Sequence, residues 1–408
     1  MNPSPAGTLN SAIEPSHGVT SPPRRPRDPR LDFFRGLAMY IILIAHIPRN
    51  PWTHWIPARF GFSDATEIFV FCSGMASAIA FGSVFANKGF WMGTARVLFR
   101  CWQVYWAHIA LFFFIAMYLA AIDTFGDFEK SYVNTLNLTP FFRDPIPNIV
   151  GLFSLTYVPN YFDILPMYLV ILAMMPLFVA IANRSFYLAA AIAILVWFTA
   201  NLGFIPLPAE PWSDREWFFN PFGWQLLFFT GFAFMKGWLP APPVSKVLII
   251  LAIGFVVISA PFGSWKVFSW TNASLPELGE LIRPVRGEVR DFRTKTELGI
   301  LRYIHFLALA YLAWVAVGPR GSRLLPRRQG VLSFVWKIIL HCISKVGQQS
   351  LAIFVFSMAL ARLIGFAFDQ LGREPQIVFL GNLVGFTLII FVAHVTAWFK
   401  ATPWRDRS

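Results

Sequence analysis

An arginine and a histidine eleven residues apart are the first residues of this chain that could act together in a reaction. They are Arg35 and His46, in the apolar segment "RLDFFRGLAMYIILIAH" of residues 30–46. In an α-helix this spacing is a rise of about 16 Å and a rotation of about 20° from the same face. An arginine binds phosphate groups, and a histidine can take a proton from a hydroxyl group. Asp32, three residues before Arg35, is placed to hold the guanidinium.

Two further arginines extend this set. Arg96 and Arg100 lie four residues apart and therefore on one face of a helix. Together with Arg35 they form a group of cations suited to a phosphate-bearing ligand. The alternative for Arg96 and Arg100 is that they reach toward anionic lipid headgroups.

Carboxylates and a second histidine lie toward the ends of the apolar segments opposite to those that carry Arg35, Arg96 and Arg100. Glu67 and Asp163 are each available to orient His46, and the sequence does not choose between them. A histidine held by a carboxylate is the usual apparatus for deprotonating a hydroxyl group. Arg302 and His305 open a later apolar segment on this same side, where an acceptor would bind.

The elements that carry these residues are long apolar runs. The chain has 408 residues, of which 56% are hydrophobic and 13% are charged, whereas soluble proteins average about 25% charged residues. A helix needs about 20 residues to cross a bilayer, and about 17 when it is tilted. We therefore expect an all-α polytopic membrane protein with about ten transmembrane helices, near residues 33–48, 66–86, 97–122, 162–183, 186–202, 222–238, 246–261, 299–318, 349–367 and 377–398.

The distribution of charge orients these helices. The net charge of +13 could indicate nucleic acid binding, but the basic residues form short clusters at the termini and in alternate connections. This pattern follows the positive-inside rule, so both termini are predicted to be cytoplasmic and no nucleic acid partner is expected. The predicted organisation is a disordered basic cytoplasmic tail at 1–29, one transmembrane domain at 30–400 and a cytoplasmic tail at 401–408.

Three smaller features complete the prediction. The segment 331–345, "VLSFVWKIILHCISK", is predicted to form a helix at the cytoplasmic interface, and a further crossing is the alternative. The three cysteines, Cys72, Cys101 and Cys342, lack paired spacing, so we expect neither a disulfide nor a metal site. Asp64 is placed to cap the second helix.

Several stretches of the sequence resemble a known superfamily. "RLDFFRGLAMYIILIAH" is similar to the first helix of the membrane acyltransferase 3 superfamily, with its Leu-Asp-x-x-Arg-Gly and Arg-x10-His pattern. "SDATEIFVFCSG", "RCWQVYW" and "KVGQQSLAIFVFS" resemble its second-helix Ser-Gly, third-helix Arg–Tyr-Trp and Gly-x-x-Ser-Leu stretches. The segments "GFSDATEIFVFCSGM" and "NYFDILPMYLVIL" resemble the OpgC branch, whose members add succinyl groups to osmoregulated periplasmic glucans.

The resemblance implies an inner-membrane O-acyltransferase in a bacterial envelope. The donor would be acyl-CoA, with succinyl-CoA expected, and the acceptor a hydroxyl of a periplasmic glucan or another glycan. Ser73 and Tyr105 would join Arg35, Asp32, Arg96 and Arg100 in binding the donor, and His46 would act as the base with Glu67 or Asp163.

Two alternatives remain open at this level. One is a transporter that exports an anionic metabolite or glycan and uses the same charges as a path. The other is an acetyltransferase of the same superfamily that acts on another glycan. The sequence leaves the oligomeric state open.

Overall fold

The computed structural model describes residues 28–326 and 329–405, and in these ranges the chain is built from helices, with one isolated β-bridge between Pro208 and Glu216. The α-helices are α1 (Pro29–His46), α2 (Ala65–Ala80), α3 (Gly82–Phe125), α4 (Thr139–Arg143), α5 (Pro145–Ser154), α6 (Ile164–Arg184), α7 (Phe186–Asn201), α8 (Pro221–Lys236), α9 (Lys246–Gly263), α10 (Trp265–Ser274), α11 (Pro276–Glu288), α12 (Ile300–Val317), α13 (Val331–Gln348), α14 (Ser350–Leu371) and α15 (Pro375–Lys400).

The predicted all-α fold is confirmed, and each of the ten predicted apolar runs forms a helix over most of its length. Among the described residues, seven helices are long and apolar enough to cross a membrane, namely α3, α6, α9, α12, α13, α14 and α15. The apolar helices α2 and α7 are shorter, at 16 residues each. The chain is therefore a multi-pass membrane protein. The count of ten, the side of the termini and the single-domain division stay predictions.

The predicted N-terminal tail lies almost wholly outside the described residues, since residues 1–27 are not described, and the last three residues of the predicted tail 401–408 also lie outside them. The disorder predicted for 1–29 is therefore not tested.

Local sequence explains where the first two helices begin. Asp28 caps α1 by accepting a hydrogen bond from the Arg30 backbone N–H, and Pro29 stands at the first helical position. Asp64 caps α2 as predicted, and Glu67 completes a capping box by accepting from the Asp64 backbone N–H at 2.7 Å. These caps set the register of both helices and thus the direction in which their polar side chains point.

One predicted segment differs from the structure. The run 66–86 was expected to be one crossing, but α2 ends at Ala80 and the chain turns into α3, where Gly89 has a φ of +80°. A glycine adopts this left-handed conformation without steric penalty, so it allows the break inside α3. The connection between α9 and α12 contains the helical pair α10 and α11.

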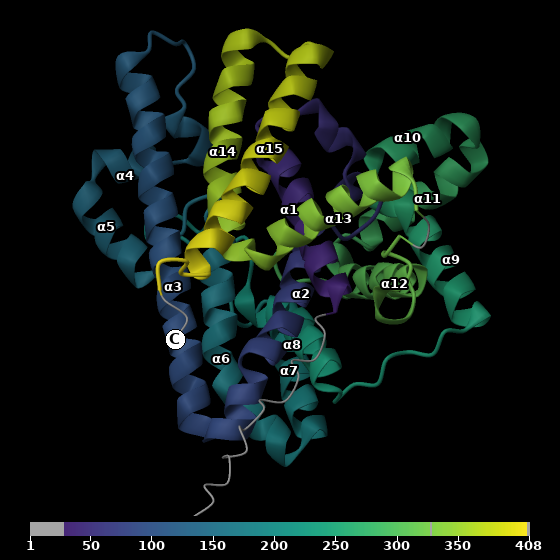
Figure 1. Cartoon of the computed structure of the whole chain (residues 1–408). Coiled ribbons are helices and arrows are strands. Elements are labelled where there is room, and N and C mark those ends of the chain that lie inside the picture. The colour runs from purple at the N-terminus through teal and green to yellow at the C-terminus, as the bar shows by residue number, and fades with distance from the viewer. Residues whose placement is uncertain (1–27, 327–328, 406–408) are drawn as a thin grey trace, which may run out of the picture.

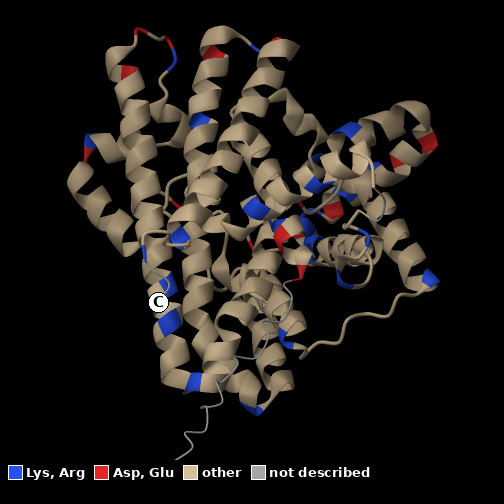
Figure 2. Ribbon diagram, in the orientation of Figure 1, with Lys and Arg blue, Asp and Glu red and all other residues tan. Residues whose placement is uncertain are grey.

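The helices do not all run in one direction. Figure 1 shows α3, α14 and α15 along the vertical of the view, whereas α13 crosses obliquely and α12 is seen nearly end-on. The segment 331–345 lies within α13, which packs against α1, and whether it is interfacial or spanning stays a prediction. In Figure 2 basic residues mark the lower ends of α3 and of the α6–α8 group, and acidic residues mark the upper ends of α3 and α14.

Glycines allow two of the closest helix contacts. A Cβ atom at Gly74 in α2 would collide with the Phe228 carbonyl group of α8. A Cβ atom at Gly36 in α1 would collide with the Ile343 carbonyl group of α13. Small residues at such points let two helix backbones approach each other inside a membrane protein.

Candidate functional site: two cavities along α1

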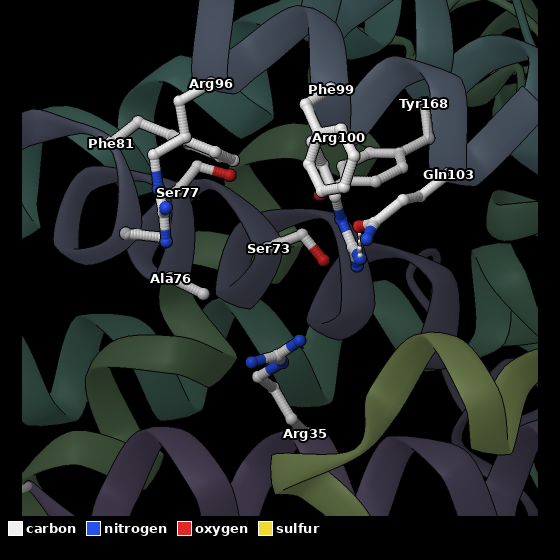
Figure 3. A pocket seen from close by; sticks show the side chains of 11 residues that line it. Arg35, Ser73, Ala76, Ser77, Phe81, Arg96, Phe99, Arg100, Gln103 and Tyr168 are labelled. Atoms are coloured by element: carbon white, nitrogen blue, oxygen red, sulfur yellow. Dashed lines mark hydrogen bonds between the residues drawn. The ribbon is translucent and has the colours of Figure 1, made fainter. Parts of the chain in front are cut away.

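A cavity of about 300 Å³, called the inner cavity after its predicted cytoplasmic side, lies between α1, α2, α3 and α6. Figure 3 shows Arg35 pointing into it from one side and Arg96 and Arg100 from the opposite side. Ser73 of α2 lines the space between them, and none of the described residues that line the cavity is acidic. The structure therefore brings together the predicted cation set around a space that favours an anionic ligand.

Arg35 is fixed by the start of α14. Its Nη2 donates a hydrogen bond to the Ser350 hydroxyl group, while its buried Nε has no hydrogen-bond partner in the described part of the chain. The guanidinium thus keeps donor capacity for a ligand. Arg100 donates to the Gln103 side chain at 3.0 Å.

Lys400 adds a fourth cation beside the inner cavity. Its Nζ donates to Gln349 Oε1 at 2.7 Å, one residue before Ser350, and its charge acts on both Arg35 and Arg100. Among the described residues no ion pair involves any of these four cations. Like charges this close are unfavourable unless an anion joins them.

The Gly-x-x-Ser-Leu stretch now has a physical explanation. Gly347 faces the Asp32 carbonyl oxygen so closely that a Cβ atom could not fit, so the glycine lets α13 approach α1. Three residues later Ser350 reaches Arg35. The glycine and the serine therefore place the start of α14 against the cation set.

The other predicted donor-binding residues have different surroundings. Asp32 is buried, and its Oδ2 accepts a hydrogen bond from Gln348 at 3.3 Å, while its charge also acts on Arg35. Tyr105 is not among the residues that line the inner cavity. Its hydroxyl group donates to the Phe153 carbonyl oxygen at 2.8 Å and so joins α3 to α5.

A second cavity of about 360 Å³, called the outer cavity after its predicted side of the membrane, lies further along α1, α2 and α6 and reaches α14. His46 of α1, Asp163 before α6 and Lys295 before α12 contribute its ionisable groups. Tyr161 stands edge-on to the imidazole, with ring centroids 5.3 Å apart. The structure therefore places Arg35 in the inner cavity and His46 in the outer one, as their spacing predicted.

The hydrogen bond of His46 decides its tautomer. Nδ1 lies 2.7 Å from the carbonyl oxygen of Ile42, and a carbonyl oxygen can only accept. Nδ1 therefore carries the proton, and in the neutral ring Nε2 keeps its lone pair free to act as a base. The backbone of α1 itself, and neither predicted carboxylate, makes this orienting bond.

The two candidate carboxylates are in different places. Asp163 lines the outer cavity, is 4% exposed and accepts a hydrogen bond from the Phe218 backbone N–H at 3.2 Å. Glu67 is fully buried outside the cavity lining and pairs with Arg302 at 2.6 Å. Of the two, only Asp163 shares a cavity with His46.

A buried ion-pair network supports α2 behind the outer cavity. Arg302 contacts Asp64 as well as Glu67, and Lys295 pairs with Asp64 at 2.6 Å. Burial alone would raise the pKa of the Asp64 carboxyl, but Lys295 and Arg302 hold it well below its usual range. Because Arg302 points into this network, it does not line the outer cavity as an acceptor-side residue.

His305, the other predicted acceptor-side residue, is also buried away from the outer cavity. Its Nδ1 lies 2.7 Å from the Ser63 hydroxyl oxygen and accepts from the Ser63 backbone N–H at 3.3 Å. It therefore anchors the segment that precedes α2.

An aromatic pair lies between the two cavities. On α2, Phe69 stands on one helix face between Thr66 of the outer cavity and Ser73 of the inner cavity. Its ring stacks on Phe354 of α14 at 5.6 Å between centroids, and Phe354 also lines the outer cavity. A chain that runs along α2 from one cavity to the other therefore passes Phe69.

Comparison with known proteins adds the family. The chain matches the family model for the OpgC protein over residues 27–401, a range that includes both cavities. The chain belongs to the OpgC family. No curated protein and no solved structure matches it. The resemblance to OpgC seen in the sequence is thereby confirmed, and OpgC membership suggests an acyltransferase-type enzyme with a glucan succinyltransferase-like role.

Several residues at the OpgC cavities were not singled out from the sequence. Ser350 was part of a sequence motif that had no assigned role, and Lys295 lay in a connection to which the sequence assigned no role. Arg362 had a usable signal, since an arginine inside an apolar run is a functional candidate by default. The Arg362 guanidinium stacks on the Tyr161 ring at 4.0 Å. No sequence pattern pointed to Tyr161 or Lys400 as functional residues.

Proposed function

We propose that this OpgC-family protein is an inner-membrane O-acyltransferase that moves a succinyl group from acyl-CoA to a hydroxyl group of a periplasmic glucan. One observation carries the proposal: α1 holds an arginine in the inner cavity and a histidine with a free Nε2 in the outer cavity, on one helical stripe. Family membership supports the same activity class.

The inner cavity supports the choice of donor. Arg35, Arg96 and Arg100 line it, with Lys400 beside it and no acidic residue in its lining. Coenzyme A is rich in phosphate groups, which arginines bind through charge-assisted hydrogen bonds. The pantetheine arm would then extend along α1 and carry the thioester past Phe69 to His46.

The outer cavity supports the chemistry. His46 Nε2 takes the proton from the acceptor hydroxyl as the oxygen attacks the thioester carbonyl carbon. The C–O bond forms and the C–S bond breaks, and the imidazolium returns its proton to the departing thiolate to give free coenzyme A. Asp163, which shares the cavity, is the carboxylate available to stabilise the imidazolium that forms.

The test compares ester groups on periplasmic glycans by mass spectrometry in cells that produce the wild type, His46→Ala, Arg35→Ala or His394→Ala. His394 is a matched control, because its Nδ1 makes the same kind of contact with the Ile390 carbonyl oxygen at 2.9 Å but lines neither cavity. We expect His46→Ala to lower the transfer activity by a factor of about 10²–10⁴. His394→Ala should modify glycans as the wild type does.

Normal modification by His46→Ala would rule out the proposed base. If wild-type cells carry no protein-dependent esters, the glucan is not the acceptor. Export of an anionic metabolite that depends on Arg35 but leaves no ester would favour a transporter.

A further inference from the structure

The segment before α12 is held unusually firmly at the wall of the outer cavity. Four successive backbone carbonyl oxygens accept hydrogen bonds of 2.8–3.0 Å from groups on α7, on α8 and at the start of α8. The pairs are Lys295 with Trp224 Nε1, Thr296 with the Asn220 backbone N–H, Glu297 with Asn201 Nδ2, and Leu298 with Trp197 Nε1. The backbone of Lys295 is thereby fixed with respect to two neighbouring helices.

Lys295 is the one cationic residue among the described residues that line the outer cavity. Its Nζ lies over the rings of Phe218 and Phe219, at 5.9 Å and 5.5 Å from their centroids. Its charge acts on His46, which lines the same cavity. Arg362, the other cation that acts on His46, stacks on Tyr161 and is not part of the lining.

The partner of Lys295 can release it. Asp64 Oδ2 also contacts Arg302 at 3.4 Å, and its Oδ1 accepts from the Thr66 backbone N–H at 2.7 Å. If the Lys295 ammonium turns toward a ligand, the buried Asp64 carboxylate therefore keeps a cation and a helix-capping bond. A buried carboxylate with a single cationic partner would be left as an unpaired buried charge by such a movement.

The apolar part of the wall makes this cation necessary only for a particular ligand. Ile42, Ile164, Phe354 and Met358 give the cavity apolar sides. A neutral acyl chain could lie against them unaided, but a carboxylate placed there needs a positive partner because desolvating an unpaired charge is costly. A lysine on a flexible stem can reach such a carboxylate while its backbone stays fixed.

We propose that Lys295 binds the free carboxylate at the far end of the transferred acyl group and thereby selects dicarboxylic over monocarboxylic acyl donors. The inference rests on the proposed acyl transfer and deepens it by naming the residue that determines acyl specificity. In this arrangement the thioester carbon lies at His46, and the second carboxylate points to the segment before α12.

The experiment measures kcat/KM for succinyl-CoA and for butyryl-CoA, a neutral donor, with a glucan acceptor and the full chain in lipid vesicles. The proteins are the wild type, Lys295→Met, Lys295→Arg and Lys266→Met. Lys266 is a matched control, an exposed lysine over the Trp55 ring at 4.4 Å that lies outside the outer cavity. A charge-assisted hydrogen bond is worth about 10- to 100-fold in binding, so Lys295→Met should lower the succinyl-to-butyryl ratio by about that factor.

Lys295→Arg keeps the charge and should retain most of the preference, and Lys266→Met should match the wild type. A succinyl-to-butyryl ratio that stays unchanged in Lys295→Met would overturn the proposal. If both kcat/KM values fall equally, the ratio is also unchanged, and Lys295 then acts at the reacting carbonyl group or in the fold.

A second measurement needs no variant. The wild type should use the methyl ester of the succinyl donor about 10- to 100-fold less well than succinyl-CoA itself. Equal use would overturn the proposal. A wild type that transfers neither acyl group would instead refute the proposed function, and this inference with it.

Discussion

The Arg35 guanidinium donates a hydrogen bond to the Ser350 hydroxyl group, 315 residues further along the chain. This bond joins the first helix to the start of α14 at the wall of the inner cavity. It holds one nitrogen of the guanidinium while Nε remains without a hydrogen-bond partner among the described residues. Arg35 is therefore aimed at the cavity before any ligand arrives, which reduces the entropy lost on binding.

Replacing Ser350 with alanine should therefore weaken donor binding. Without the hydroxyl group the Arg35 side chain becomes mobile, and a neutral-to-charged hydrogen bond is worth about 1.5–3 kcal/mol. We expect KM for acyl-CoA to rise about 10-fold with a smaller change in kcat, as measured by steady-state kinetics. Ser357→Ala is the control, because among the described residues Ser357 bonds only to its own helix, at the Phe354 carbonyl oxygen. A fall in kcat alone would contradict the positioning role of Ser350.

Replacing Lys400 with methionine should also raise the dissociation constant for coenzyme A, because one of four cations at the inner cavity is lost. At a partly exposed site the effect is about 3- to 10-fold and should shrink as salt is added. Equilibrium binding of coenzyme A at several salt concentrations measures it. Lys246→Met removes an exposed lysine at the start of α9, away from the inner cavity, and should bind as the wild type does. Equal effects in both variants would indicate non-specific attraction.

A methyl group at Gly347 should destabilise the fold. Its Cβ atom would collide with the Asp32 carbonyl oxygen, a backbone atom that cannot move without shifting α1. Overpacking of this kind costs about 1–3 kcal/mol, so Gly347→Ala should lower the midpoint of thermal unfolding in detergent. Gly254→Ala in α9 is the control, since nothing lies within 4 Å of its Cβ position. Comparable stability of the two variants would contradict the close contact.

Glu67→Gln should act on stability before it acts on catalysis. Its carboxylate pairs with Arg302 in a buried network, and removing one partner of a buried pair costs about 3–5 kcal/mol at most where, as here, the cation keeps a second carboxylate in Asp64. We expect a lowered unfolding midpoint, and a kcat near that of the wild type for the fraction that remains folded. Unfolding and single-turnover rates measured on the same preparation separate the two effects. A stable variant with a greatly reduced kcat would instead return Glu67 to the catalytic role that the sequence suggested.

Removing the Phe69 ring should open a passage between the cavities. Phe69→Ala leaves a void beside Phe354, so water from the inner cavity could reach a thioester held at His46 without an acceptor present. We expect acyl-CoA hydrolysis in the absence of glucan to rise several-fold relative to transfer. Release of free thiol with and without acceptor measures this ratio. An unchanged ratio would show that the pair does not separate the two compartments.

Much of the architecture follows from local rules that one helix contains by itself. The apolar runs predict the helices because a buried backbone must satisfy its own hydrogen bonds, and Asp64 predicts a cap because the first N–H groups of α2 lack partners. The stripe from Arg35 to His46 depends only on helical periodicity. For these features the sequence was sufficient.

Relationships between distant segments were decided by packing. Glu67 and Asp163 looked equivalent as partners for His46, but Glu67 turns to Arg302, while α1 supplies the Ile42 carbonyl oxygen to the imidazole. Tyr105 looked like a donor-binding residue and instead joins α3 to α5. A carboxylate or hydroxyl group pairs with whatever the fold brings within about 3 Å. Sequence spacing determines that distance within one helix, whereas only the tertiary structure determines it between helices.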